Sequence, residues 1–190
     1  LASQLKYLQH LLTRRVKSRL MTPSAQHPHP QESPHVAPPT EAELTAANIN
    51  PRTGLATDYL NHFNEAIMLL DMIPDMPECV EDFLNWQPLT YREHFAASNF
   101  KARDLAILAY ERSDANLRAE FDDITGTITS ILTAVGAAMR EARQDRTRIK
   151  LAEQAAGWLR PLATLAGGII HGSRDEAEAD IDSIMTKDLK

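Results

Sequence analysis

The stretch FDDITGTITSIL at residues 121–132 holds candidate catalytic side chains. Asp123 and Thr127 are four residues apart, so on a helix a carboxylate and a hydroxyl share one face. Two interpretations are open. In the first, the run Asp-Ile-Thr-Gly is a fragment of a catalytic signature, and Asp123 and Thr127 are its reactive groups. In the second, both residues flank, on the surface, a buried apolar seam formed by Phe121, Ile124 and Ile128.

Two pairs of histidine and glutamate are candidates for a metal site, His62 with Glu65 and Glu93 with His94. A carboxylate-bridged site in a helical bundle needs an E-x-x-H pair on each of two helices and two further glutamates. Neither pair has that order and spacing. We therefore predict no cofactor and interpret both histidines as partly buried, with a helix-bundle metalloprotein as a second alternative function. The usual zinc-hydrolase, P-loop and serine-hydrolase motifs do not occur, which favours a protein that is not an enzyme.

The elements that would position these groups are helices. Apolar residues at helical spacing predict a helix over 55–73, which stops before Pro74, and a short helix that ends near Trp86. Thr90 is a suitable N-cap for a third helix, and helical spacing continues through 105–112. Aromatic residues make up only 6% of the chain, which suits packed helices better than sheets. The sequence predicts an all-α helical bundle.

The longest regular pattern spans residues 117–170, where apolar positions alternate in spacing between four and three. Its members are Leu117, Phe121, Ile124, Ile128, Ile131, Val135, Ala138 and Ala142, and then, after Asp145, Ile149, Ala152, Ala156, Leu159, Ala163, Ala166 and Ile170. This pattern allows one continuous rod or an antiparallel hairpin that turns in the polar stretch QDRTR at 144–148. We favour the hairpin, because a chain of this size usually compacts. Helices over 115–170 are also the expected surface of a homodimer.

The ends of the chain differ from this helical domain, which we expect to span 51–172. Residues 1–20 carry five basic groups and no acid, and their apolar residues fall on one helical face. They form a basic amphipathic extension, for which a membrane or targeting role and an origin outside the natural protein are both open. Residues 21–50 hold six prolines and few apolar groups, which predicts a disordered leader. Its histidines are His27, His29 and His35.

The helix that carries Asp123 has a family resemblance. Phe121 and the run Asp-Ile-Thr-Gly at 123–126 resemble part of the signature of CheZ-type phosphatases, which reads approximately F-Q-D-[LIV]-T-G-Q. These helical proteins form dimeric bundles and dephosphorylate the chemotaxis response regulator CheY. The resemblance implies that Asp123 is the family acid, which enters the regulator's active site. Thr127 stands where the family has the glutamine that positions the attacking water, and Asp122 replaces the first glutamine.

The last residues, 173–190, read SRDEAEADIDSIMTKDLK. They form an acidic, flexible tail in which three apolar residues reappear at helical spacing, Ile181, Ile184 and Met185. A helix this short is marginal in isolation, because nucleation is costly. We predict a short amphipathic helix that binds a partner. The phosphatase family also ends in a tethered docking peptide, so the resemblance implies the same role.

Charge is distributed unevenly. The formal net charge is −6, residues 53–91 carry seven acids and no Lys or Arg, and residues 140–150 carry five bases and two acids. This balance argues against nucleic-acid binding. No apolar run approaches the roughly 20 residues of a membrane span, and a lone cysteine, Cys79, fits a reducing compartment. We predict a cytoplasmic partner-binding protein, regulatory or adaptor in role. The alternative is a phosphatase, or a degenerate relative, that acts on a response regulator.

Overall fold

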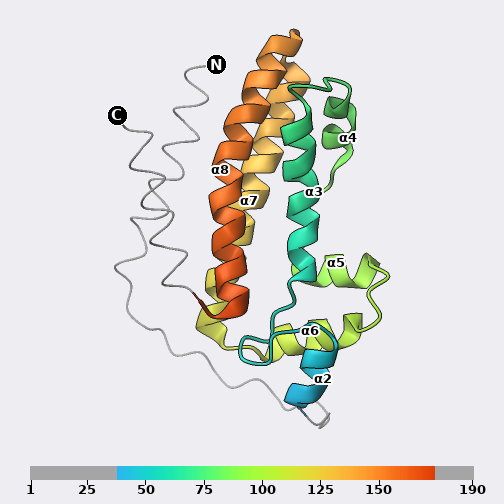
Figure 1. The fold of residues 1–190 in the computed structure, drawn as a ribbon, viewed down its shortest axis with the longest axis vertical. Coiled ribbons are helices and arrows are strands. Elements are labelled where there is room, and N and C mark those ends of the chain that lie inside the picture. Colours follow the sequence, from blue (N-terminus) through green and yellow to red (C-terminus); the bar gives the residue numbers. More distant parts are fainter. Residues whose placement is uncertain (1–37, 174–190) are drawn as a thin grey trace, which may run out of the picture. The chain divides into compact units, whose positions relative to one another are not determined.

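The computed structural model describes residues 38–173, in which helices joined by loops form the regular secondary structure and no β-strand occurs (Figure 1). The helices are α2 (Glu41–Ala46), α3 (Asp58–Met72), α4 (Cys79–Asn85), α5 (Tyr91–Ala97), α6 (Arg103–Arg112), α7 (Ala115–Glu141) and α8 (Asp145–His171). The all-α prediction is therefore confirmed. None of these helices combines the length and apolarity that a membrane crossing requires.

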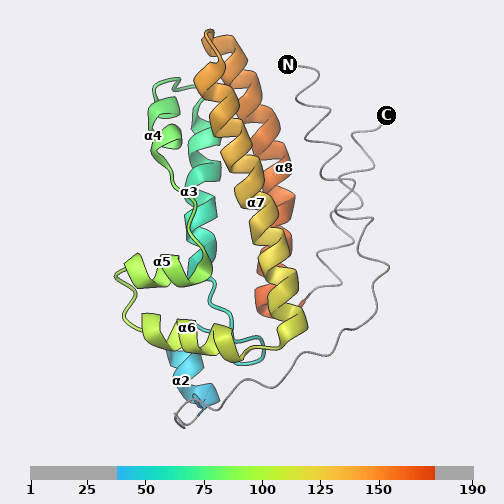
Figure 2. The ribbon, with the colours of Figure 1, turned by 180° about the vertical axis from the view of Figure 1, so that it is seen from behind.

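The helices α3, α7 and α8 lie side by side and form the body of the domain (Figures 1 and 2). Residues 142–144 reverse the chain between α7 and α8, which are 27 residues each, so these two helices run antiparallel. The reversal overlaps the first residue of the polar stretch 144–148, in which the sequence placed a turn. Helix α4 packs against α3 and α7, while α5 and α6 pack together at the end where α3 begins.

The buried side of α7 is wider than the predicted seam. Phe121, Ile128, Ile131 and Val135 are buried as expected. Four further residues are also buried, Thr125, Leu132, Gly136 and Met139. The predicted members Leu117, Ile124, Ala138 and Ala142 are half-exposed. The reason is that α7 contacts α4 as well as α8, and two neighbours require a broader apolar stripe than a coiled-coil seam provides.

Local signals start and stop the two long helices. The Asp114 carboxylate accepts hydrogen bonds from the backbone N–H groups of Asn116 and Leu117, so it caps α7. Helix α8 continues through Pro161 to His171 and is capped by Gly172, whose φ of 69° is the left-handed conformation that favours glycine. At this end, the Thr53 hydroxyl donates to the Ile170 carbonyl at 2.8 Å. The loop before α3 is thereby tied to the end of α8.

The folded part begins earlier than position 51, where the sequence analysis placed its start. Helix α2 opens with a capping box, in which Thr40 and Glu43 satisfy each other's backbone N–H groups. Leu44 and Ile49 are 6% and 1% exposed, and Ile49 forms an antiparallel bridge with Ala56. Residues 38–50, the last part of the predicted disordered leader, are therefore ordered, because they carry two apolar anchors. Residues 1–37, which include the basic extension, lie outside the described residues.

This boundary leads to a prediction about truncation. A chain that begins at Asn50 loses α2 and uncovers the apolar surface that Leu44 and Ile49 occupy, so we expect its melting temperature to fall by about 5 °C. A chain that begins at Pro38 keeps both anchors and is the matched control. Thermal unfolding followed by circular dichroism makes the comparison. Equal melting temperatures for the two chains would mean that α2 adds nothing to stability.

Candidate functional site

Carboxylates gather on the exposed sides of α3 and α4 and on the turn between them. We call this surface the acidic face, and its members are Glu65, Asp71, Asp75, Glu78, Glu81 and Asp82, all exposed. Asp71 forms an ion pair with Arg160 of α8. Among the described residues, the other five carboxylates form no ion pair. Within residues 38–173, most of the negative charge of the acidic face is therefore not balanced by an ion pair.

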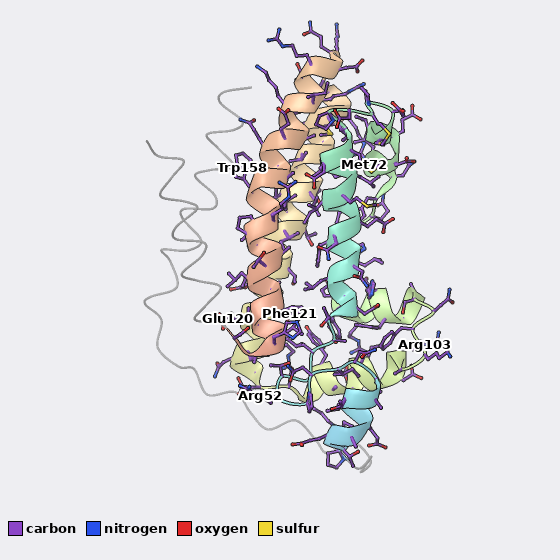
Figure 3. All side chains as sticks on the ribbon, in the orientation of Figure 1. Arg52, Met72, Arg103, Glu120, Phe121 and Trp158 are labelled. Carbon is purple, nitrogen blue, oxygen red and sulfur yellow. The ribbon has the colours of Figure 1, made fainter. Side chains whose placement is uncertain are left out.

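Methionines lie among these carboxylates. Met68 and Met76 are 55% and 37% exposed, and they are the large apolar side chains that solvent reaches most in residues 38–173. Met72 is half-buried between them, at the end of α3 that lies beside α4 (Figure 3). Met68 and Met72 are four positions apart and so share one side of α3, while Met76 lies in the turn between α3 and α4. We call these three residues the methionine stripe. The acidic face is thus apolar along its middle.

An open hollow of about 420 Å³ lies between α3 and α4. It is lined by Glu65 and Leu69 of α3, by Asp82 and Asn85 of α4, and by Trp86, which follows α4. Leu69 and Trp86 give it an apolar wall, while Glu65 and Asp82 supply negative charge. Its volume falls in the range of roughly 300–1,000 Å³ that is usual for ligand pockets. The arrangement suits a group with an apolar body and a positive charge nearby.

The position of Trp86 is fixed by His62. The Trp86 indole N–H donates to the His62 carbonyl at 3.0 Å, and the two rings stack with centroids 4.8 Å apart. His62 Nε2 in turn accepts the backbone N–H of Leu89 at 3.1 Å. Burial, with a smaller effect of His94, lowers the pKa of His62 to about 4. The ring is therefore neutral near pH 7, and the hollow is preorganised.

An aromatic cluster supports this region from inside. Tyr59 packs edge-on against Phe63 and Tyr91, and its hydroxyl donates to the Leu89 carbonyl at 2.8 Å. The Tyr91 hydroxyl accepts the backbone N–H of Ala56, and its ring stacks on Tyr110. Burial raises the pKa of both Tyr59 and Tyr91 above the usual value. These tyrosines are neutral structural groups that join α3, α5 and α6.

The candidate catalytic residues lie away from the hollow. Asp123 is exposed, and the Thr127 hydroxyl donates to the Asp123 carbonyl at 2.8 Å, a bond within α7. The neighbouring Asp122 joins two helices, because both of its carboxylate oxygens accept a hydrogen bond from the Tyr110 hydroxyl of α6 at 2.8 Å. Partial burial raises the pKa of Asp122. This link between α6 and α7 was not anticipated from the sequence.

Replacing Thr127 tests the family resemblance. We expect Thr127→Gln to change the free energy of unfolding by less than about 0.5 kcal/mol, because glutamine is a good helix former and the position is on the flank of the buried stripe. Urea unfolding measures this effect. The same variant restores the glutamine of the phosphatase signature. Higher phosphatase activity towards a phosphorylated response regulator would support the resemblance, and activity that stays at background would count against it.

Among the candidate metal ligands named from the sequence, the structure brings His62 and His94 together, with ring centroids 5.9 Å apart. His94 pairs with Asp58 at 3.1 Å, while Glu65 faces the hollow. Within residues 38–173, no three histidine, cysteine or carboxylate side chains converge as metal ligands do. The partner-binding residues of the tail, Ile181, Ile184 and Met185, lie outside the described residues. The hollow was missed from the sequence, although Trp86 beside the acidic run was its visible signal.

Comparison with known proteins gives no match: no family model, no curated protein and no solved structure matches this chain. The fold and the acidic face are therefore the basis for functional inference. The resemblance of residues 121–126 to CheZ-type phosphatases stays a prediction.

Proposed function

We propose that this is a cytoplasmic protein that binds a protein partner, in a regulatory or adaptor role, and that the acidic face is its recognition surface. One observation carries the proposal. Five carboxylates without an ion-pair partner among the described residues surround exposed methionines and a preorganised hollow. The buried free thiol of Cys79 agrees with a reducing compartment.

The free-energy cost of leaving the acidic face uncovered supports the proposal that a partner binds it. Like charges close together repel one another and destabilise the compact state, so a surface of one sign is unfavourable unless it is used. Exposed methionines also leave apolar area in water. A partner of opposite charge relieves both costs when it covers the surface. Complementary charge then raises the association rate and selects the partner.

The tail supplies a second contact in this proposal. Ile181, Ile184 and Met185 are too few for a core of their own, and each contributes up to roughly 1.5–3 kcal/mol when it is fully buried. Because the tail is tethered, its binding adds to that of the acidic face by raising the effective concentration of a second contact. A homodimer through helices over 115–170 is not required and stays a prediction.

Capture of partners from the native cell tests the proposal. Reversal of two charges at the hollow, Glu65→Lys with Asp82→Lys, should reduce the recovered partner at least about tenfold. The matched control reverses two exposed carboxylates of the hairpin helices, Glu141→Lys with Glu153→Lys, and should leave recovery unchanged. Removal of 174–190 should weaken recovery as well. Equal recovery by all variants would reject the acidic face as the recognition surface.

A further inference from the structure

We propose that the partner binds the acidic face through a basic amphipathic helix. In this complex the helix lays its apolar side along the methionine stripe and places one large apolar side chain in the hollow against Trp86. The inference rests on the proposed function and names the chemistry of its partner. The proposed occupant is a helix of the partner protein named in the proposed function.

The shape of the surface favours a helix. Met68 and Met72 lie one turn apart on the same side of α3, about 6 Å along its axis, and Met76 follows in the turn before α4. The hollow lies beside this stripe, between α3 and α4. A helix presents its anchors at positions i, i+3, i+4 and i+7, so neighbouring anchors can contact Met68 and Met72 while another enters the hollow. An extended strand would need a free sheet edge, and residues 38–173 contain no sheet.

The side chains of the surface suit an apolar helix face. Methionine is unbranched and polarizable, so it adapts to the shape of a partner at low cost. Trp86 offers a broad indole face that His62 already holds in place, so little ordering is needed on binding. Aromatic residues in a preorganised pocket are the usual sites where most binding energy is concentrated. Trp86 is therefore the expected anchor point.

The charges of the surface require that the helix be basic. Glu65 and Asp82 line the hollow, and Asp75 and Glu78 lie next to Met76 in the turn before α4. Lysines or arginines that flank the apolar anchors of a bound helix would meet these carboxylates. Because the carboxylates are exposed, such pairs select the partner and speed its association more than they tighten the complex. Binding should weaken as salt rises, since the screening length is about 8 Å at 0.15 M.

The same charges argue against the chain's own tail as the occupant. Residues 175–182 carry five acids and no base, so the acidic face would repel the segment that precedes and includes Ile181. Nucleic acid is repelled for the same reason. A basic peptide without an apolar side would satisfy the carboxylates but leave the methionine stripe and the hollow uncovered. A basic helix with one apolar side satisfies both features.

Tryptophan fluorescence can report on the hollow directly. The chain has two tryptophans, so Trp158→Phe in the full chain leaves Trp86 as the single reporter (Figure 3 shows Trp158 on α8). The probe is a peptide of leucine and lysine, about as long as α3, with its leucines on one helical face. We expect a saturable shift of the Trp86 emission to shorter wavelength. Two control peptides carry glutamate in place of lysine, or the same residues in scrambled order, and neither should produce it.

Variants then separate the apolar contribution from the charges. Met68→Gln keeps the length of the side chain and should weaken peptide binding about tenfold. Glu65→Lys with Asp82→Lys should weaken it at least about tenfold at low salt. The matched control, Glu141→Lys with Glu153→Lys, should bind the peptide within about twofold of the parent, because these residues lie on α7 and α8. Circular dichroism confirms that each variant keeps its helical content.

Each contrary outcome has a distinct meaning. If the scrambled peptide binds equally well, charge alone is recognised and the helical partner is rejected. If no peptide binds while partner capture still depends on Glu65 and Asp82, the proposed function stands and the basic helix is rejected. If neither experiment depends on these residues, both proposals fail. Should the peptide bind only after removal of residues 1–20, the occupant is the chain's own basic segment, and the assignment to a partner protein is overturned.

Discussion

Ile128→Asp is expected to lower the melting temperature by about 10–20 °C, because the change removes a well-packed side chain and buries a carboxylate in its place. Ile128 is 0% exposed on α7, the helix that packs against α8 and α4. Loss of its packing and burial of a polar group together cost on the order of 5 kcal/mol. That amount is comparable to the whole stability of a typical domain. Much of the protein is then expected to be unfolded at 37 °C.

Two controls isolate the cause of this loss. Ser130→Asp places the same carboxylate two residues away on the exposed side of α7, and should change the free energy of unfolding by less than about 0.5 kcal/mol. Ile128→Val keeps an apolar side chain at the buried position and should cost about 1 kcal/mol. Thermal and urea unfolding provide both values. Normal stability of Ile128→Asp would mean that this side of α7 faces solvent.

The helices were predictable because the signals that define them are local. Spacing of three and four placed the long helices α7 and α8, and the cap at Thr90 placed the start of α5. Helix α2 was missed although its capping box, Thr40 to Glu43, is readable in the sequence. Six prolines in residues 21–50 suggested disorder across the whole segment, but all six lie at or before position 39, and residues 40–50 contain none. The composition of a long window concealed a short helix at its end.

The candidate site was less predictable, because it depends on contacts between distant residues. The acidic run and its lack of bases are visible in the sequence, and so are the methionines. Which side of α3 they occupy relative to α4 depends on packing that no local pattern determines. Trp86 reaches the hollow because its indole N–H finds the His62 carbonyl, 24 positions earlier. The Tyr110–Asp122 bond likewise needs the packing of α6 against α7.

Lowering the pH from 7 to 5 is expected to reduce the free energy of unfolding by about 2 kcal/mol, because His62 is protonated more readily in the unfolded chain. Burial holds the pKa of His62 near 4 in the folded chain, below the value of about 6.5 in an unfolded chain. The unfolded state therefore binds more protons in this interval, and stability falls as pH falls from about 6.5 towards 4. Protonation of His62 also breaks a hydrogen bond, because a protonated Nε2 can no longer accept the Leu89 N–H.

The interval above pH 5 isolates this histidine from the carboxylates whose pKa is perturbed. The capping-box hydrogen bonds of Thr40 and Thr90 lower the pKa of Glu43 and Glu93, so their contributions to stability are lost only at more acidic pH. Asp122 has a raised pKa in the folded chain, so its protonation favours the folded state as the pH falls.

His62→Gln retains an acceptor for the Leu89 N–H and cannot titrate, so urea unfolding of this variant should show a much flatter dependence on pH. The control Asn64→Gln changes an exposed residue of the same helix that does not titrate, and should keep the parent's slope. If the free energy of unfolding of His62→Gln depends on pH as steeply as that of the parent, another group causes the acid sensitivity. The position of Trp86 in the hollow would then not depend on the charge of His62.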